Sequence, residues 1–519
     1  MPLFPVLASR NRLPHWGTIA KWHLGLCEPV QVLLCPKPDH WRENLKNPRF
    51  ILLITSDQQR ADSLGTYGSK TARSPHLDAL GAEGTVFERA YCSNSICIPS
   101  RACIVTGRYP HQHGVEYMED VVDDTPGLPP WETTFMERLQ RAGIRTAAFG
   151  KMHLYPLPPR GFDEMKLTGG QGARWEVSSG SPLGPGPLGE EYASWLDQKR
   201  PGAYESIYAQ RRTEEYKRHR SAVTSVLSFD EYVDTWTADN TIDYFRRHRD
   251  STSPIFAWCG FCNPHAPYDA PKPYDSMYDP AKMTISDTFM RDMSDRPAHY
   301  MKRQGISGKN LTPDMLKRIM AYYFGLCTMV DDLCGRIFNQ LKAMGIWEET
   351  LVIFTTDHGE LLGDYGLFNK NCFFESVINV PLIIKPAGGH PAVRRTKGMA
   401  ELIDIAATVL QSAGIEKPPF MEADSLLPVM EGKSPGKGLI LSEYTEGDRS
   451  RKGKCVRTAR YKYNFWMPGS EEELYDMDTD PLETRNIAGD PAYAGILSDM
   501  RVKMISRLTD SEKPLLGPG

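Results

Sequence analysis

Residues 50–57 read Phe-Ile-Leu-Leu-Ile-Thr-Ser-Asp, with five consecutive apolar side chains followed by three polar ones that end in a carboxylate. A continuous apolar run of this length is typical of a strand that is buried on both faces, as in a parallel sheet. Four other segments combine a short apolar run with polar residues soon after it. These segments are residues 145–149, 254–261, 351–354 and 381–384.

Stretches with apolar residues at helical spacing separate these runs, at residues 132–142, 229–248, 313–344 and 400–413. Strands that alternate with helices predict an α/β fold with a doubly wound, mostly parallel sheet flanked by helices. Ligands of such sheets bind beyond the carboxyl ends of the strands. The pattern by itself therefore predicts a site at the side chains that follow the strands, which are Asp57, Lys151, His265, Asp357 and His358.

Three regions are expected along the chain. Residues 1–48 lack helical or strand periodicity and are interpreted as an N-terminal extension. Residues 49–430 carry the catalytic α/β pattern, interrupted at 168–190 by a loop rich in Gly, Pro and Ser. Residues 431–519 show closely spaced strand patterns and a terminal helix from about residue 491 to 508, which predicts a small antiparallel sheet subdomain with one helix packed on it.

Composition excludes several classes of protein. A formal net charge of −4 provides no basic surface for nucleic acid, and no apolar stretch reaches the length of a membrane span. We see no secretory signal, and the 11 cysteines are an odd number, so reduced thiols and a cytoplasmic location are expected. Cys259 and Cys262 have the spacing of a redox or zinc motif but lie in an apolar run, which favours two buried core cysteines.

The run Cys97-Ile98-Pro99-Ser100-Arg101 is the strongest candidate for a nucleophilic site. Pro99 suits the first turn of a helix that continues to Thr106-Gly107, so Cys97 is expected at a helix N-terminus, where backbone N–H groups favour an anion. Arg101 lies four residues on and can face the same point. A lone cysteine is more often a buried apolar residue, and a thiolate with a histidine base is the competing chemistry.

With its Thr106-Gly107 tail, this run resembles the signature of the formylglycine-dependent sulfatase family, within the alkaline-phosphatase-like superfamily. The resemblance extends from about residue 49 to 489. It implies that a separate formylglycine-generating enzyme oxidises Cys97 to formylglycine (3-oxoalanine), an aldehyde that acts as its hydrate.

The resemblance also implies one divalent metal ion. Ile54–Gln58 resembles the first metal motif of the family, and Thr356–Glu360 resembles the second. Asp57-Gln58 with Asp357-His358 is closest in style to bacterial choline sulfatases and phosphonate monoester hydrolases. The implied ligands are Asp57, Gln58, residue 97, Asp357 and His358. Calcium is expected on family grounds, and manganese is the alternative because an imidazole replaces an oxygen ligand.

Further motifs carry the remaining implied roles. Lys151 and His153 stand in Gly-Lys-Met-His-Leu, His265 in Pro-His-Ala-Pro, and Lys370 in Leu-Phe-Asn-Lys. By resemblance, Lys151 and Lys370 bind sulfate, His153 helps to turn over the hydrate, and His265 protonates the leaving oxygen, while Arg101 holds the nucleophile. His111 and His113 are given a supporting role.

We therefore expect a sulfuric ester hydrolase that releases inorganic sulfate from a small-molecule or carbohydrate sulfate ester. A phosphonate monoester hydrolase or phosphodiesterase with the same nucleophile is the alternative, because both substrates present a similar tetrahedral anion. A non-catalytic binding protein of the same fold and a thiol hydrolase are further alternatives. Nucleic acid and membrane are not expected partners. A homo-oligomer is compatible with the sequence.

Overall fold

The computed structural model describes residues 47–117, 127–155, 158–168 and 190–512. Residues 1–46 of the predicted extension lie outside the described residues, as does nearly all of the Gly-, Pro- and Ser-rich segment 168–190. The elements below belong to the part of the chain from Asn44 onward, which forms one compact unit.

An eight-stranded sheet has the spatial order β10-β2-β9-β7-β1-β6-β4-β5. The central strand β1 pairs in parallel with β6 and β7, and β4 pairs in parallel with β5 and β6. This confirms the predicted mostly parallel α/β sheet. The strands are β1 (Phe50–Asp57), β2 (Thr85–Phe87), β4 (Arg145–Gly150), β5 (Glu164–Leu167), β6 (Ile255–Pro264), β7 (Thr350–Thr356), β9 (Leu382–Lys385) and β10 (Arg395–Thr396).

Strand β9 runs against the direction of the others in the centre of the sheet, because it pairs antiparallel with both β7 and β2. Its four side chains are buried like those of β1. A strand covered on both faces shows the same apolar run in either direction. The sequence pattern therefore located this strand but carried no information about its orientation.

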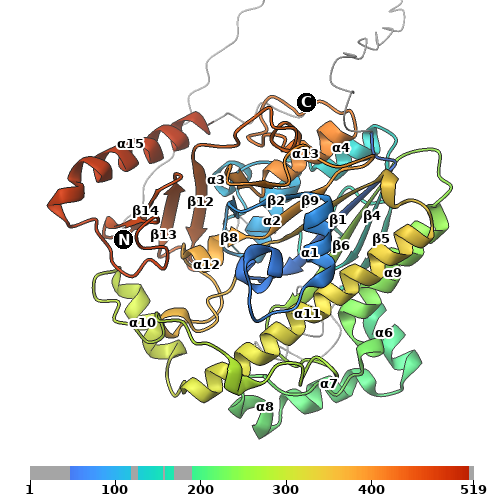
Figure 1. Cartoon of the computed structure of the whole chain (residues 1–519), viewed down its shortest axis with the longest axis horizontal. Coiled ribbons are helices and arrows are strands. Elements are labelled where there is room, and N and C mark those ends of the chain that lie inside the picture. Colours follow the sequence, from blue (N-terminus) through green and yellow to red (C-terminus); the bar gives the residue numbers. More distant parts are fainter. Residues whose placement is uncertain (1–46, 118–126, 156–157, 169–189, 513–519) are drawn as a thin grey trace, which may run out of the picture. The chain divides into compact units, whose positions relative to one another are not determined.

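Helices cover both faces of the sheet (Figure 1). Alternate residues of β1 belong to two separate apolar clusters: Phe50, Leu52 and Ile54 to one, Ile51 and Leu53 to the other. On the first face lie α1 (Pro75–Glu83), α6 (Glu190–Lys199), α7 (Ala203–Arg211), α9 (Val233–His248) and α11 (Pro313–Ala343). On the second lie α2 (Cys97–Thr106), α4 (Phe135–Arg141) and α13 (Asp404–Ser412). Further helices are α3 (Pro110–His113), α8 (Glu214–Arg218), α10 (Ala298–Ser307), α12 (Glu375–Ile378) and α14 (Leu427–Met430).

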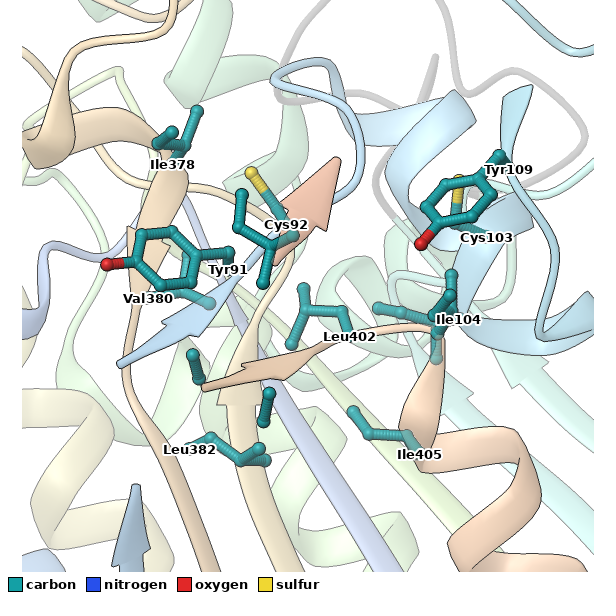
Figure 2. Packing of buried hydrophobic residues seen from close by; sticks show 14 of the residues in the cluster. Tyr91, Cys92, Cys103, Ile104, Tyr109, Ile378, Val380, Leu382, Leu402 and Ile405 are labelled. Atoms are coloured by element: carbon teal, nitrogen blue, oxygen red, sulfur yellow. The ribbon is translucent and has the colours of Figure 1, made fainter. Parts of the chain in front are cut away.

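The predicted helix 400–413 is wrong over its first four residues. Ala400–Glu401 forms strand β11, which pairs with β3 (Ala90–Tyr91), and β3 also pairs with β8 (Asn379–Val380). The helix starts only at Asp404, whose carboxylate accepts a hydrogen bond from the backbone N–H of Glu401 at 2.9 Å. Figure 2 shows Leu402 and Ile405 packed with Tyr91 and Val380 at this junction. Pairing with a distant strand has overridden the local helical pattern.

The predicted C-terminal sheet is confirmed as four antiparallel strands in sequential order. Its strands are β12 (Ile440–Thr445), β13 (Lys452–Arg457), β14 (Tyr461–Met467) and β15 (Glu471–Asp476), and α15 (Ala494–Asp510) follows them. Apolar residues of this sheet, including Trp466 and Leu474, belong to the same cluster as α2 and α13. The boundary between residues 430 and 431 stays a prediction.

The described cysteines are all buried, and none of them is paired in a disulfide bond. Cys259 and Cys262 have no exposed surface and lie within β6, so they are core residues, as predicted. Among the described residues, no helix is both long enough and apolar enough to cross a membrane.

Candidate active site

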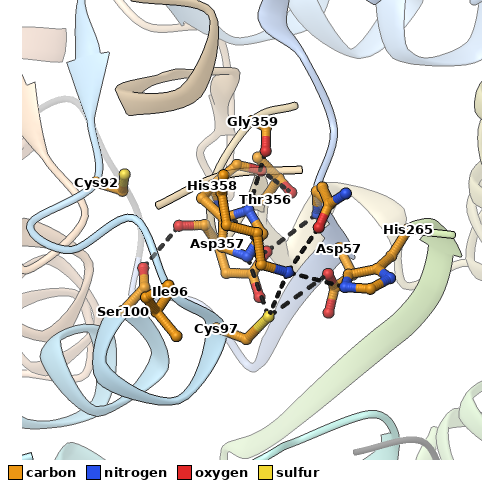
Figure 3. A network of polar contacts seen from close by, with 12 residues as sticks. Asp57, Cys92, Ile96, Cys97, Ser100, His265, Thr356, Asp357, His358 and Gly359 are labelled. Atoms are coloured by element: carbon orange, nitrogen blue, oxygen red, sulfur yellow. Dashed lines mark hydrogen bonds and ion pairs between the residues drawn. The ribbon is translucent and has the colours of Figure 1, made fainter. Parts of the chain in front are cut away.

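Cys97 is the first residue of α2, as the position of Pro99 predicted. The residue before it, Ile96, is extended, and its N–H donates to Asn94 Oδ1 at 2.8 Å, which fixes the entry to the helix. The side chain is 2% exposed, and its Sγ lies 3.1 Å from His358 Nε2 and 4.0 Å from Asp57 Oδ1 (Figure 3). The helix N-terminus thus points residue 97 at the carboxyl ends of β1 and β7.

Arg101, one turn further along α2, joins the two carboxylates of the site. Its Nε donates to Asp357 Oδ2 at 2.9 Å, and its Nη2 donates to Asp57 Oδ2 at 3.3 Å. None of the three side chains is exposed. A buried guanidinium between two carboxylates holds both in place and offsets their charge. Ser100 Oγ also donates to the Asp357 carbonyl at 2.6 Å.

Four buried side chains form a group suited to a metal ion. The ligand atoms of Asp57, Cys97, Asp357 and His358 all lie within 4.8 Å of one another. Burial would raise the pKa of Asp57, but the cationic side chains around it, with Lys151 first, outweigh burial and hold that pKa well below its usual range, so the carboxylate is ionised. Two carboxylates with an imidazole fit a divalent cation with mixed oxygen and nitrogen ligands.

Gln58 lies beside this group, but its amide is engaged in other contacts. Its Oε1 accepts a hydrogen bond from Lys370 Nζ at 2.6 Å, and its Nε2 donates to the buried Glu360 carboxylate. Its backbone is left-handed, with φ 61°, and its N–H donates to Asp357 Oδ1 at 3.2 Å. The assignment of Gln58 as a metal ligand stays a prediction.

Two lysines and a histidine complete the group of side chains around residue 97. Lys151 forms an ion pair with Asp57, and Lys370 Nζ lies 3.3 Å from Cys97 Sγ and 2.8 Å from His265 Nε2. Burial and then the charge of Lys370 hold the pKa of His265 well below its usual range. His265 is therefore neutral here: Nε2 accepts from Lys370, and Nδ1–H donates to the Ala266 carbonyl at 2.7 Å.

His153 is 6% exposed and has a left-handed backbone, with φ 51°. Within the part of the chain that the structure describes, neither ring nitrogen has a hydrogen-bond partner. Burial, followed by the charges of Lys151 and Arg101, holds the pKa of His153 well below its usual range. A neutral imidazole with free nitrogens is suited to accept a proton.

All the predicted site residues thus lie at the carboxyl edge of the sheet, but sequence reasoning gave no role to Glu360, Asn369 or Asn371. Glu360 Oε1 accepts from the backbone N–H of Asn369 at 2.5 Å, while its other oxygen contacts Gln58. Asn369 and Asn371 are left-handed, with φ 65° and 73°. An asparagine on each side of Lys370 was a usable signal, because asparagine tolerates this conformation better than most residues.

The supporting histidines lie outside the metal group. His111 Nδ1 contacts the Glu443 carboxylate, and its Nε2 lies 3.0 Å from Ser511 Oγ. His113 Nε2 lies 3.4 Å from Cys103 Sγ in α2, and burial lowers the pKa of His113 to about 3. His113 therefore contacts α2, whereas His111 connects α3 to β12 and to the residue after α15.

A second group of potential ligands, His76, Asp331 and Asp332, also occurs among the described residues. The Asp331 carboxylate accepts the backbone N–H groups of His76 and Leu77 at 3.1 and 2.7 Å. It therefore caps the N-terminus of α1 from α11, which is a structural role.

The family model described as sulfatase matches residues 49–415. The chain belongs to the sulfatase family. A second family model, described as the C-terminal part of N-sulphoglucosamine sulphohydrolase, matches residues 363–510. This confirms the resemblance drawn from the motifs, and with the relatives below it makes the chain a sulfuric ester hydrolase.

Relatives and solved structures agree with this assignment. An arylsulfatase of Clostridium perfringens is 29% identical over 472 residues, which cover 89% of this chain and 95% of that protein. A choline-sulfatase of Rhizobium meliloti is 25% identical over 452 residues, 85% of this sulfatase and 82% of that protein. The crystal structure of a phosphonate monoester hydrolase of Agrobacterium radiobacter shares the fold, with a TM-score of 0.71, 24% identity and coverage of 89% of this chain and 96% of the other.

Proposed function

We propose that this sulfatase hydrolyses an organic sulfate ester to an alcohol and inorganic sulfate, with residue 97 as the nucleophile after its oxidation from cysteine to formylglycine. The observation that carries the proposal is the position of Cys97 at the start of α2, facing Asp57, His358 and Lys370. The ester is a small-molecule or carbohydrate sulfate. A formylglycine-generating enzyme supplies the oxidised residue.

The donor set fits one divalent cation. Asp57, Gln58, residue 97, Asp357 and His358 would hold it, with calcium as the first candidate and manganese as the alternative. When bound, the ion supplies positive charge that polarises a sulfate oxygen. Asp57 and Asp357 are already fixed for this purpose by Arg101.

The cationic side chains are arranged to bind the sulfate group. Lys151 and Lys370 approach residue 97 from different segments, and Lys370 Nζ is 3.3 Å from Cys97 Sγ. Fixed positive charges stabilise the negative charge that develops on the sulfate oxygens, and this contribution is usually the largest in such reactions. Substrate binding by these lysines also orients the ester for displacement at sulfur.

Two histidines supply the proton transfers. A hydrated aldehyde at residue 97 offers two hydroxyl groups, one for displacement at sulfur and one for the release of inorganic sulfate. His265 Nε2 lies beside Lys370 Nζ and donates a proton to the departing alcohol oxygen once the bound anion favours its charged form. His153, neutral and buried, accepts the proton of the hydrate.

The decisive experiment is intact mass analysis of the tryptic peptide 90–101 from protein made in its native host, combined with kinetics. We expect the peptide mass to fall from that of a thiol to that of an aldehyde, and a Cys97→Ala variant to lose turnover. A Cys103→Ala variant in the same helix is the control and keeps the modification. An unmodified peptide in active enzyme supports a direct thiol mechanism instead.

Kinetics on matched esters test the substrate class. We expect kcat/KM for 4-nitrophenyl sulfate to exceed that for the corresponding phenylphosphonate ester. A sulfate ester that is turned over no better than the phosphonate favours the phosphonate monoester hydrolase alternative. Enzyme that turns over neither ester and binds sulfate without releasing product supports the binding-protein alternative.

A further inference from the structure

The segment that carries Lys370 has an unusual backbone. Asn369 and Asn371, on either side of the lysine, are both left-handed, and so are Leu362 and Tyr365 earlier in the same segment. Residues other than glycine keep such conformations only where the surrounding structure holds them. The backbone position of Lys370 therefore depends on contacts from other segments of the chain.

Helix α10 supplies these contacts with two consecutive side chains. Arg303 Nη2 donates to the Lys370 carbonyl at 2.6 Å, and Arg303 Nη1 donates to the Asn371 carbonyl at 2.9 Å. Gln304 Nε2 donates to the Tyr365 carbonyl at 2.9 Å. Among the described residues, no backbone N–H donates to the carbonyl of Lys370 or Asn371. The planar guanidinium of Arg303 thus supplies the hydrogen bonds to both carbonyl oxygens.

The helix that presents Arg303 is itself fixed. Tyr300, one turn earlier, is 1% exposed and packs between Phe374 and Trp466, with ring centroids 5.3 and 6.0 Å away. Residues three apart lie on the same side of a helix, so this anchor also sets the direction of Arg303. In Figure 1, α10 lies next to the C-terminal strands, in agreement with these ring contacts.

We propose that Arg303 is a positioning residue for Lys370, and this inference rests on the proposed role of Lys370 in sulfate binding. Arg303 holds the carbonyl groups of Lys370 and of Asn371, which belong to the two consecutive peptide bonds that follow Lys370. The lysine Nζ then reaches Cys97 Sγ at 3.3 Å and His265 Nε2 at 2.8 Å. Misplacement of a binding group by about 1 Å costs on the order of a hundredfold in rate. Helix α10, which carries none of the sequence motifs, thus positions the sulfate-binding Lys370 through the main chain.

The test measures two quantities in the formylglycine-containing, metal-loaded enzyme: kcat/KM for 4-nitrophenyl sulfate, and the affinity for inorganic sulfate by titration calorimetry. We expect R303Q to lower both by about 10- to 100-fold. R303K keeps a donor near the carbonyls and should lie between R303Q and the parent enzyme. Lys302 is the neighbouring exposed residue of the same helix, so K302Q is the matched control and should stay within about twofold of the parent.

A double-mutant cycle separates positioning from other roles. If Arg303 acts through Lys370, R303Q should change sulfate affinity by less than about twofold in a K370M background. An undiminished effect of R303Q in that background shows that Arg303 acts on the substrate or on general stability and overturns the inference, as does an R303Q enzyme that matches K302Q. A K370M enzyme with unchanged sulfate affinity instead refutes the proposed role of Lys370, which is a separate result.

Discussion

Lys462 of β14 offers the sharpest test of how the C-terminal sheet supports the site. Its side chain has no exposed surface. The ammonium forms ion pairs with Glu483 and, at 3.4 Å, with Glu375, and it donates to the Phe373 carbonyl at 2.7 Å. Burial raises the pKa of Glu375, but Lys462, together with Arg457 and a hydrogen bond from Tyr91, outweighs burial and holds that pKa below its usual range. Lys462 therefore lies between two largely buried carboxylates, and Arg457 Nε is a second cation 3.7 Å from Glu375 Oε1.

Lys462→Met keeps the volume of the side chain but removes this charge. One carboxyl is then expected to take up a proton at pH 7, which is about 2.5 pH units above the ordinary glutamate pKa of 4.5. At about 1.4 kcal/mol per unit, this protonation costs about 3.5 kcal/mol of folding free energy. The value agrees with the roughly 3–5 kcal/mol lost when one partner of a buried ion pair is removed. At pH 5 the same protonation costs only about 0.7 kcal/mol, so the defect should shrink.

Urea denaturation of the purified variants at pH 5 and pH 7, followed by tryptophan fluorescence, measures these differences. Lys452→Met is the matched control, because Lys452 lies on the adjacent strand β13, pairs with Glu116 at 2.8 Å and is 47% exposed. We expect the control to lose about 0–1 kcal/mol. A Lys462→Met variant that is no less stable than the control, or whose loss is the same at both pH values, refutes the charge-burial reasoning.

Three further predictions concern the site and the α1 cap. His265→Gln should lower kcat by about 10²- to 10⁴-fold for alkyl sulfates, whose leaving group must be protonated. The loss should be much smaller for 4-nitrophenyl sulfate, because its leaving group needs little protonation. Equal losses on both substrates in steady-state kinetics contradict the role of His265 as the acid. Removal of metal by a chelator should abolish turnover. Metal analysis of the untreated enzyme should find about one divalent ion per chain, and the double variant Asp57→Ala, Asp357→Ala should lack this ion. Full activity without metal contradicts the assignment. Burial raises the pKa of Asp331 to about 7, above its ordinary 3.8, so this group contributes stability at low pH that is lost as pH rises from about 4 to 7. Asp331→Asn should flatten the fall in the urea midpoint between pH 5 and 7.5, and an unchanged slope contradicts the assignment.

Much of the α/β sheet and of the site could be predicted because the relevant signals are local. The run at residues 50–54 reports burial on both faces, and Asp57 follows it where a parallel strand exposes its carboxyl end. Cys97 and Pro99 mark the helix start by the conformations they favour, and the structure places that start at Cys97. Side chains at the ends of neighbouring parallel strands meet at one edge, so the convergence of Asp57, Asp357 and His265 follows from the strand pattern.

The sequence by itself therefore determined the fold class, the strand-end residues and the helix that carries residue 97. Only the tertiary structure decided the direction of β9, the pairing of Ala400–Glu401 and the partners of the Gln58 amide. It also revealed that Arg303 holds the carbonyl of Lys370, 67 residues further along the chain. The physical reason is that periodicity records burial and local backbone preference, whereas contacts between distant segments depend on how whole elements pack.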